Sequence, residues 1–134
     1  MTQIIIDNSV SQSDFTELDL SRFLQLKSLS VGDHCFSYVN EVKMIGLSEL
    51  ESVEIGKNSF TKFKNTWRVT SDPNRHFYLK NCPKLKSLKI GDYSFSNYIV
   101  CEIENVDALE VIRIGGCNFK YASLELKSIL IHSE

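Results

Sequence analysis

An eleven-residue pattern that occurs four times constrains the fold of this chain more than any other feature. Its clearest copy runs from Leu85 to Phe95, with Leu88 and Ile90 between them and a glycine directly after the isoleucine. This glycine recurs at positions 32, 56, 91 and 115, so the spacings are 24, 35 and 24 residues. A recurring spacing in this range is typical of a solenoid, in which successive repeats stack as coils.

A second apolar segment precedes each copy of the pattern. Counting back eight, six and three residues from the first leucine always finds an apolar residue or a cysteine, as with Phe77, Leu79 and Cys82 before Leu85. The alternation of apolar and polar residues in both segments predicts β-strands. Each repeat should therefore contain two strands separated by turns, and equivalent residues should stack into columns between parallel strands. One expected column consists of Phe36, Phe60, Phe95 and Phe119.

The 134 residues are predicted to form a single solenoid domain of about five coils. Residues 4–6 resemble the end of one further second strand, and residues 124–131 match the first strand of a closing coil. An insertion of 11 residues, within 61–76, interrupts the period, and insertions in solenoids form loops on one face. We expect each repeat glycine to adopt a positive φ where the chain leaves the sheet.

Composition and charge exclude several functional classes. The chain is 43% hydrophobic and 24% charged, which is ordinary for a soluble globular protein. Its net charge of −2 gives no general reason to bind nucleic acid or an anionic membrane. No apolar run is long enough to span a bilayer, and residues 1–8 lack the basic start of a signal peptide. We therefore expect a cytoplasmic protein, or an extracellular one if the chain is a fragment.

The four cysteines predict neither a metal site nor a disulfide framework. None of Cys35, Cys82, Cys101 and Cys117 belongs to a C-x-x-C pair, which argues against zinc. Cys82 and Cys101 occupy columns that are otherwise apolar. We expect free thiols that behave as small buried hydrophobes.

The repeats resemble leucine-rich repeats. Residues 50–60, L-E-S-V-E-I-G-K-N-S-F, fit the family pattern L-x-x-L-x-L-x-x-N-x-L with phenylalanine in the last position. The I-G-x-x-S-F segment is closest to the BspA-like subclass, which has I-G-x-x-A-F. The other copies have His34, Tyr93 and Cys117 where the family has asparagine. The resemblance implies a mainly β, right-handed solenoid with two short parallel strands per repeat of about 24 residues, used in protein–protein recognition and without intrinsic chemistry.

Two outward-facing columns of the predicted sheet carry charges. One column alternates in sign: Lys27, Glu51, Lys86 and Glu110. This alternation favours a solvated face with compatible charges, which helps to set the register of the stack, over a binding site. The second column changes from neutral to acidic and then to basic, and no structural reason explains it. Its charged members, Glu54, Lys89 and Arg113, are candidate contacts for a partner.

The insertion supplies the leading candidate for partner binding. It contains the only tryptophan, Trp67, together with Arg68 and Arg75, and Tyr78 lies on the strand that follows. Tryptophan, tyrosine and arginine are the residues that most often dominate binding energy at protein interfaces. Equally open is the alternative that Trp67 only packs the loop against the body.

These patterns predict a non-catalytic protein-recognition module whose protein partner the sequence does not identify. The alternative is a structural subunit that stacks end to end, or within a larger assembly, because an open solenoid exposes its terminal sheet edges. A small enzyme is the least favoured alternative, since no sequence motif brings together an acid, a base and an oxyanion donor. The adjacent His34 and Cys35 should face opposite sides of a strand. No cofactor is expected.

Overall fold

A computed structural model of the chain describes residues 2–64, 66, 68, 70–116, 118–119 and 123–127, the last of these as backbone only. The described residues form ten β-strands and no helix, and hence no helix long and apolar enough to cross a membrane. The strands are β1 (Gln3–Ile6), β2 (Glu17–Asp19), β3 (Ser28–Val31), β4 (Glu41–Ile45), β5 (Ser52–Ile55), β6 (Asp72–Lys80), β7 (Ser87–Ile90), β8 (Tyr98–Glu104), β9 (Val111–Ile114) and β10 (Ser123–Lys127).

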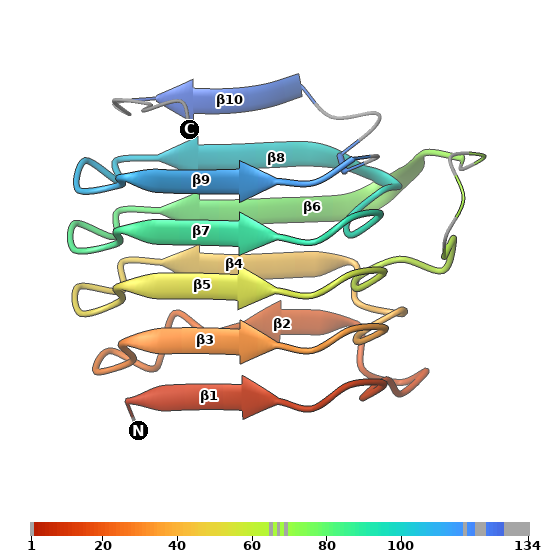
Figure 1. Cartoon of the computed structure of the whole chain (residues 1–134), viewed down its shortest axis with the longest axis horizontal. Coiled ribbons are helices and arrows are strands. Elements are labelled where there is room, and N and C mark those ends of the chain that lie inside the picture. The colour runs from red at the N-terminus through yellow and green to blue at the C-terminus, as the bar shows by residue number, and fades with distance from the viewer. Residues whose placement is uncertain are drawn as a thin grey trace.

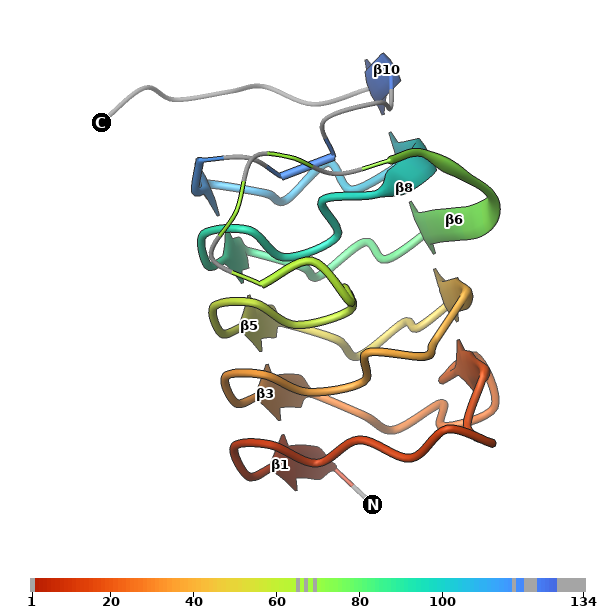
Figure 2. The same cartoon turned by 90° about the vertical axis from the view of Figure 1, so that its right-hand side faces the viewer.

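The strands form two parallel five-stranded sheets on opposite sides of a β-solenoid (Figures 1 and 2). Sheet A has the order β1-β3-β5-β7-β9, and sheet B has the order β2-β4-β6-β8-β10. Each strand pairs with its equivalent one coil away, so that Val53 of β5 lies between Leu29 of β3 and Leu88 of β7. The predicted mainly β architecture, with two parallel strands per coil and about five coils, is confirmed.

The core lies between the two sheets and contains the predicted aromatic column. Ring centroids are 5.3 Å apart from Phe36 to Phe60, 4.5 Å from Phe60 to Phe95 and 5.0 Å from Phe95 to Phe119. The last two pairs are stacked, with interplanar angles of 8°. Phe15 continues the column toward the N-terminal coil, 5.5 Å from Phe36. These contacts link every described coil from the first to the last repeat.

The expected positive φ at the repeat glycines is wrong. Gly46 is the only glycine with a positive φ among the described residues. The repeat glycines are required instead because adjacent coils approach closely: a Cβ on Gly91 would lie 2.6 Å from the carbonyl carbon of Gly56 and 2.7 Å from the nitrogen of Lys57. Positive φ values occur further along each turn, as at Phe60 with 57°.

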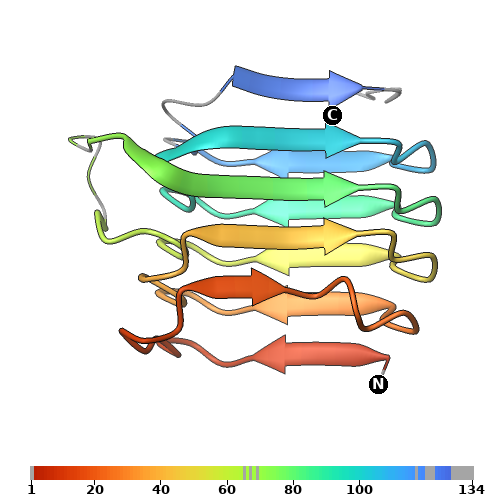
Figure 3. The ribbon, with the colours of Figure 1, turned by 180° about the vertical axis from the view of Figure 1, so that it is seen from behind.

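The insertion differs from the loop that the sequence predicted over residues 61–76. Its last five residues, 72–76, belong to β6, which is longer than β4 and curves at its start (Figure 3). The pairing of β6 with β8 shifts register between Asp72 and His76. The described residues between 61 and 71 lie outside a strand, and the strand extension brings Arg75 into the interior.

Both terminal coils follow the predicted alignment where they are described. Ile4 and Ile6 of β1 pair with Leu29 and Val31 of β3. At the other end β10 pairs with β8, and Leu124 is opposite Cys101 as predicted. Residues 128–131 of the predicted closing coil lie outside the described residues.

Candidate functional site

The predicted contact residues lie in different parts of the solenoid. Three of them are neighbours on the outer face of sheet A: Glu54, Lys89 and Arg113. Tyr78 is half-buried on the outer face of sheet B, and Arg68 is exposed on the insertion. Trp67 lies outside the described residues. Only the sheet A residues are therefore brought together as a group.

Arg75 is a core residue rather than the exposed contact that the sequence predicted, because only 1% of it is accessible to solvent. Its guanidinium donates hydrogen bonds to the carbonyl oxygens of Ser37, at 2.9 Å, and Phe60, at 3.4 Å. Asp72 lies 3.4 Å from its Nε, and the ring of Tyr98 lies 5.8 Å from its Cζ. Arg75 thus joins neighbouring coils at the root of the insertion.

Tyr98 completes this buried polar contact. The insertion carries the chain away from the coil between β5 and β6 (Figure 1), and Tyr98 is the first residue of β8 in the next coil. Its buried hydroxyl donates to the carbonyl of Val39 at 2.5 Å, two coils away. Burial raises the pKa of Tyr98, so the phenol keeps its proton and can donate this hydrogen bond. Arg75 and Tyr98 therefore have a structural role.

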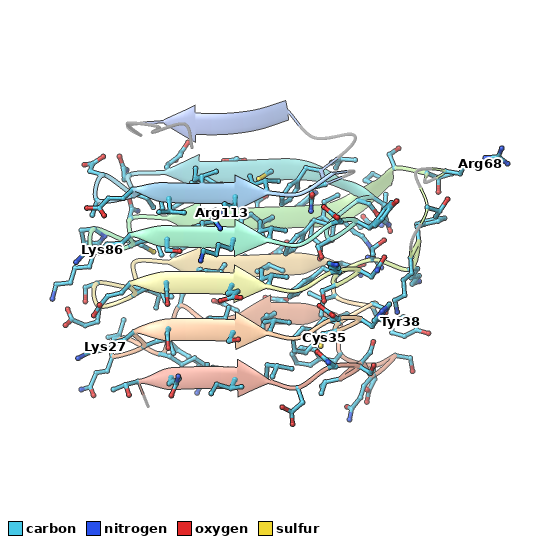
Figure 4. All side chains as sticks on the ribbon, viewed as in Figure 1. Lys27, Cys35, Tyr38, Arg68, Lys86 and Arg113 are labelled. Carbon is cyan, nitrogen blue, oxygen red and sulfur yellow. The ribbon has the colours of Figure 1, made fainter. Side chains whose placement is uncertain are left out.

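An open groove of about 590 Å³ lies across the ends of β5, β7 and β9 on sheet A. Its lining includes the column of Glu54, Lys89 and Arg113 and three of the repeat glycines, Gly56, Gly91 and Gly115. Six charged residues line it: Asp33, Glu54, Lys57, Lys89, Asp92 and Arg113. Figure 4 looks onto this face and labels Arg113. Within the described part of the chain, Glu54, Lys57 and Lys89 have no ion-pair partner within 4.0 Å, so these charges are available to a ligand.

Sheet B presents a contrasting surface, because the lysines described on its outer face, Lys43 and Lys80, are paired with neighbouring carboxylates. Lys80 lies 2.8 Å from Glu102 and 3.6 Å from Glu104, and it also lies 5.3 Å from the ring of Tyr78. The hydrogen bond to Glu102 raises the pKa of Lys80. A partner that bound here would have to replace these contacts.

The alternating column has the predicted register but forms no ion pairs. Its members Lys27, Glu51, Lys86 and Glu110 are exposed, and none has an ion-pair partner within 4.0 Å among the described residues. In Figure 4, Lys27 and Lys86 extend from the same edge of the solenoid. These residues lie outside the groove, which makes them suitable controls for it.

A ladder of side-chain oxygens borders the groove, and sequence reasoning missed it. Asn8 Oδ1 accepts a hydrogen bond from the Asp33 N–H, and Asp33 Oδ1 accepts one from the Lys57 N–H, each at 2.8 Å. Asp92 Oδ1 accepts from the Gly116 N–H, also at 2.8 Å. Each bond ties one coil to the next. The available signal was the Gly-Asp pair in two of the four repeats.

A second, partly buried ladder explains the serine of the I-G-x-x-S-F segment. The hydroxyl of Ser59 donates to the Gly32 carbonyl at 2.8 Å, and that of Ser94 donates to the Gly56 carbonyl at 2.6 Å. In the last repeat Asn118 Nδ2 donates to the Gly91 carbonyl at 2.8 Å. These side chains satisfy the backbone of the preceding coil, so they are structural.

The thiols are also part of the core. Cys35, Cys82 and Cys101 are free and fully buried, as predicted, while Cys117 lies outside the described residues. Burial raises the pKa of Cys101 to about 12 and also raises that of Cys82. The Cys35 thiol donates to the Asp7 carbonyl at 3.1 Å. Among the described residues, no group of three or more His, Cys, Asp or Glu could hold a metal ion.

No protein-family model matches the chain, and neither a curated protein nor a solved structure is significantly similar to it. The groove on sheet A is therefore the candidate site because of its own geometry and charge.

Proposed function

We propose that this chain is a non-catalytic protein-recognition module of the leucine-rich repeat class, closest to the BspA-like subclass. Its partner binds the outer face of sheet A, centred on the groove. The observation that carries this proposal is the difference between the two faces: Glu54, Lys57 and Lys89 on the groove lack ion-pair partners among the described residues, whereas Lys43 and Lys80 of sheet B are paired with carboxylates. Complementary charges on a partner give specificity and faster association.

The shape of sheet A supports the same proposal. Beside the charged column lie the small side chains of Ser28, Ser52 and Ser87, on β3, β5 and β7. Small side chains leave the sheet flat, so a partner can approach the strands closely. Across β5, β7 and β9 the charge passes from Glu54 to Lys89 and Arg113, which defines a polarity along the solenoid. A partner with the reverse order of charges would bind in one orientation.

A charge exchange on the groove tests this proposal. The partner is first isolated from the source cells with the wild-type chain and then measured against purified variants. Glu54→Lys combined with Lys89→Glu keeps the net charge but reverses the polarity of the groove. The matched control is Glu51→Lys with Lys86→Glu, which makes the same exchange on the same two coils outside the groove.

We expect the groove variant to weaken binding at least tenfold, about 1.4 kcal/mol, and the control to bind as the wild type does. Equal effects of the two variants would contradict the assignment of the groove as the centre of the contact. Trp67→Ala with Arg68→Ala forms a separate arm, which tests the predicted contribution of the insertion.

A second candidate function is a structural subunit that associates end to end, and one observation favours it. Among the described residues, five large hydrophobic side chains are exposed, and four of them lie in the first coil: Ile5, Val10, Phe15 and Leu24. The outer edges of β1 and β2 are also open for pairing, since these strands end their sheets. Molar mass in solution tests this alternative. A mass that rises with concentration in the wild type and stays monomeric in Ile5→Lys would support assembly, and a monomer throughout would exclude it.

A further inference from the structure

The ladder of side-chain oxygens beside the groove is interrupted at one coil. Asn8, Asp33 and Asp92 each accept a hydrogen bond from the backbone N–H of the next coil. The equivalent position in the second repeat is Lys57, whose side chain has no acceptor atom. The Asp92 N–H therefore lacks the bond that its counterparts make, and no other acceptor among the described residues replaces it.

The missing oxygen leaves a defined position beside Gly91. At Gly32, Gly56 and Gly115, the ladder oxygen lies 2.4, 2.2 and 2.2 Å from where a glycine Cβ would be. At Gly91 the three nearest atoms are backbone atoms of the preceding coil, at 2.6–2.8 Å, and none is a side-chain oxygen. The fold thus repeats a place for an oxygen atom at every coil, and the chain does not fill it at this one.

The groups around this position favour an anionic oxygen. Lys57 and Lys89 both line the groove, and neither has an ion-pair partner within 4.0 Å in the described part of the chain. A hydrogen bond from a backbone N–H to a carboxylate is stronger than one to a neutral acceptor, and a nearby ammonium adds its own charge attraction to the same carboxylate. The ladder itself uses carboxylates, because Asp33 and Asp92 supply its adjacent members.

Three carboxylates also face the groove, and they limit what can bind. Asp33, Glu54 and Asp92 balance the charges of Lys57, Lys89 and Arg113, so the lining as a whole has no net charge. One oxygen of Asp33 and one of Asp92 are already engaged by backbone N–H groups. Long-range attraction of an anion is therefore weak, and recognition depends on one short contact between the two lysines. A single carboxylate fits this arrangement better than a densely acidic segment does.

We propose that the position beside Gly91 receives one carboxylate oxygen from an aspartate or glutamate side chain of the protein partner. This oxygen accepts the Asp92 N–H and takes the place of the missing ladder residue, while Lys57 and Lys89 offset its charge. The inference rests on the proposed function and specifies the chemistry that the groove recognises.

Amide-resolved NMR titration tests the proposal with two short probes. The first is the blocked tripeptide acetyl-Gly-Asp-Gly-amide, and the control is acetyl-Gly-Asn-Gly-amide, which has a neutral acceptor in the same place. We expect a saturable downfield shift of the Asp92 amide proton with the aspartate peptide. The shift of the Gly116 amide, which already has its ladder bond, should be at least fivefold smaller, and the asparagine peptide should have little effect at the same concentration.

Two variants of the same residue locate the contact. Lys57→Asn supplies the missing oxygen from within the chain, so the Asp92 amide should already be shifted downfield and should no longer respond to the peptide. Lys57→Ala leaves the position open but removes a charge, so binding should weaken about threefold to tenfold. Equal responses to the two peptides would overturn the carboxylate assignment, and an undiminished response of Lys57→Asn would overturn its location. Either failure would overturn only the carboxylate proposal, because the charge-exchange test of sheet A does not depend on the position beside Gly91.

Discussion

Truncation of Phe60 measures how strongly the aromatic column holds the coils together. The side chain is completely buried, and its ring lies 5.3 Å from that of Phe36 and 4.5 Å from that of Phe95. Phe60→Ala removes buried apolar surface and leaves a cavity, which should lower the free energy of unfolding by about 3–5 kcal/mol. Each lost ring contact contributes about 0.5–1.5 kcal/mol of that total. Phe36→Ala should cost less, because Phe36 is 8% exposed and its ring contacts are tilted.

The backbone conformation of Phe60 predicts which of two variants, Phe60→Gly or Phe60→Ala, is the more stable. Its φ of 57° is in the left-handed region, which costs an L-residue about 1–2 kcal/mol. Glycine avoids that cost but loses about 0.5–1 kcal/mol relative to alanine because its unfolded chain is more flexible. Phe60→Gly should therefore be more stable than Phe60→Ala by roughly 0.5–1 kcal/mol, the reverse of the usual order.

Urea unfolding followed by circular dichroism gives both differences, provided that the slopes with denaturant agree among the variants. A cost below about 1 kcal/mol for Phe60→Ala would refute the account of the column, because so small a loss is incompatible with a buried, stacked ring. A glycine variant less stable than the alanine variant would refute the backbone argument.

Three further predictions concern the contacts between coils. Gly91→Ala should lower the free energy of unfolding by about 1–3 kcal/mol in the same assay. Gly116→Ala should change it by less than about 0.5 kcal/mol, because a Cβ on Gly116 meets nothing within 4 Å. Similar losses in the two variants would contradict the close-approach explanation. Tyr98→Phe should cost about 1–3 kcal/mol, since the buried Val39 carbonyl loses its donor, and a neutral substitution would show that this bond contributes nothing. Burial raises the pKa of Cys101 from its ordinary value of 9.0 to about 12, so its contribution to stability is present below pH 9 and decreases as the pH rises toward 12. Thermal unfolding of Cys101→Ala between pH 8 and 11 should accordingly show a shallower alkaline loss than the wild type, and parallel curves would contradict this.

The periodic parts of the fold were predictable from the sequence because each repeat predicts its neighbours. The position of Leu124 opposite Cys101 followed from aligning one apolar segment with another, and so did the stacking of Phe60 between Phe36 and Phe95. Parallel stacking places equivalent residues side by side, so the residue type found at one position of a column indicates the environment of every position in that column. The candidate column of Glu54, Lys89 and Arg113 was found in the same way.

Features without an equivalent in other repeats were not predictable. The insertion has nothing to align with, so the sequence predicts a loop at residues 72–76, which belong to β6, and an exposed Arg75, which is buried. Burial of this guanidinium depends on the carbonyls of Ser37 and Phe60, which come together only when the coils stack. A recurring glycine is compatible with either a positive φ or a close approach of two coils, and only the stacking of the coils distinguishes these causes.

Site-specific photo-crosslinking tests the central proposal most directly, because it reports which face of the solenoid touches the partner. A crosslinking residue replaces Ser87 on the outer face of sheet A or Val100 on the outer face of sheet B, and each variant is irradiated with the partner isolated on the wild-type chain. We expect a covalent product from position 87, reduced by the exchange of Glu54 and Lys89, and none from position 100. A product from position 100 alone would contradict the assignment of sheet A as the recognition face.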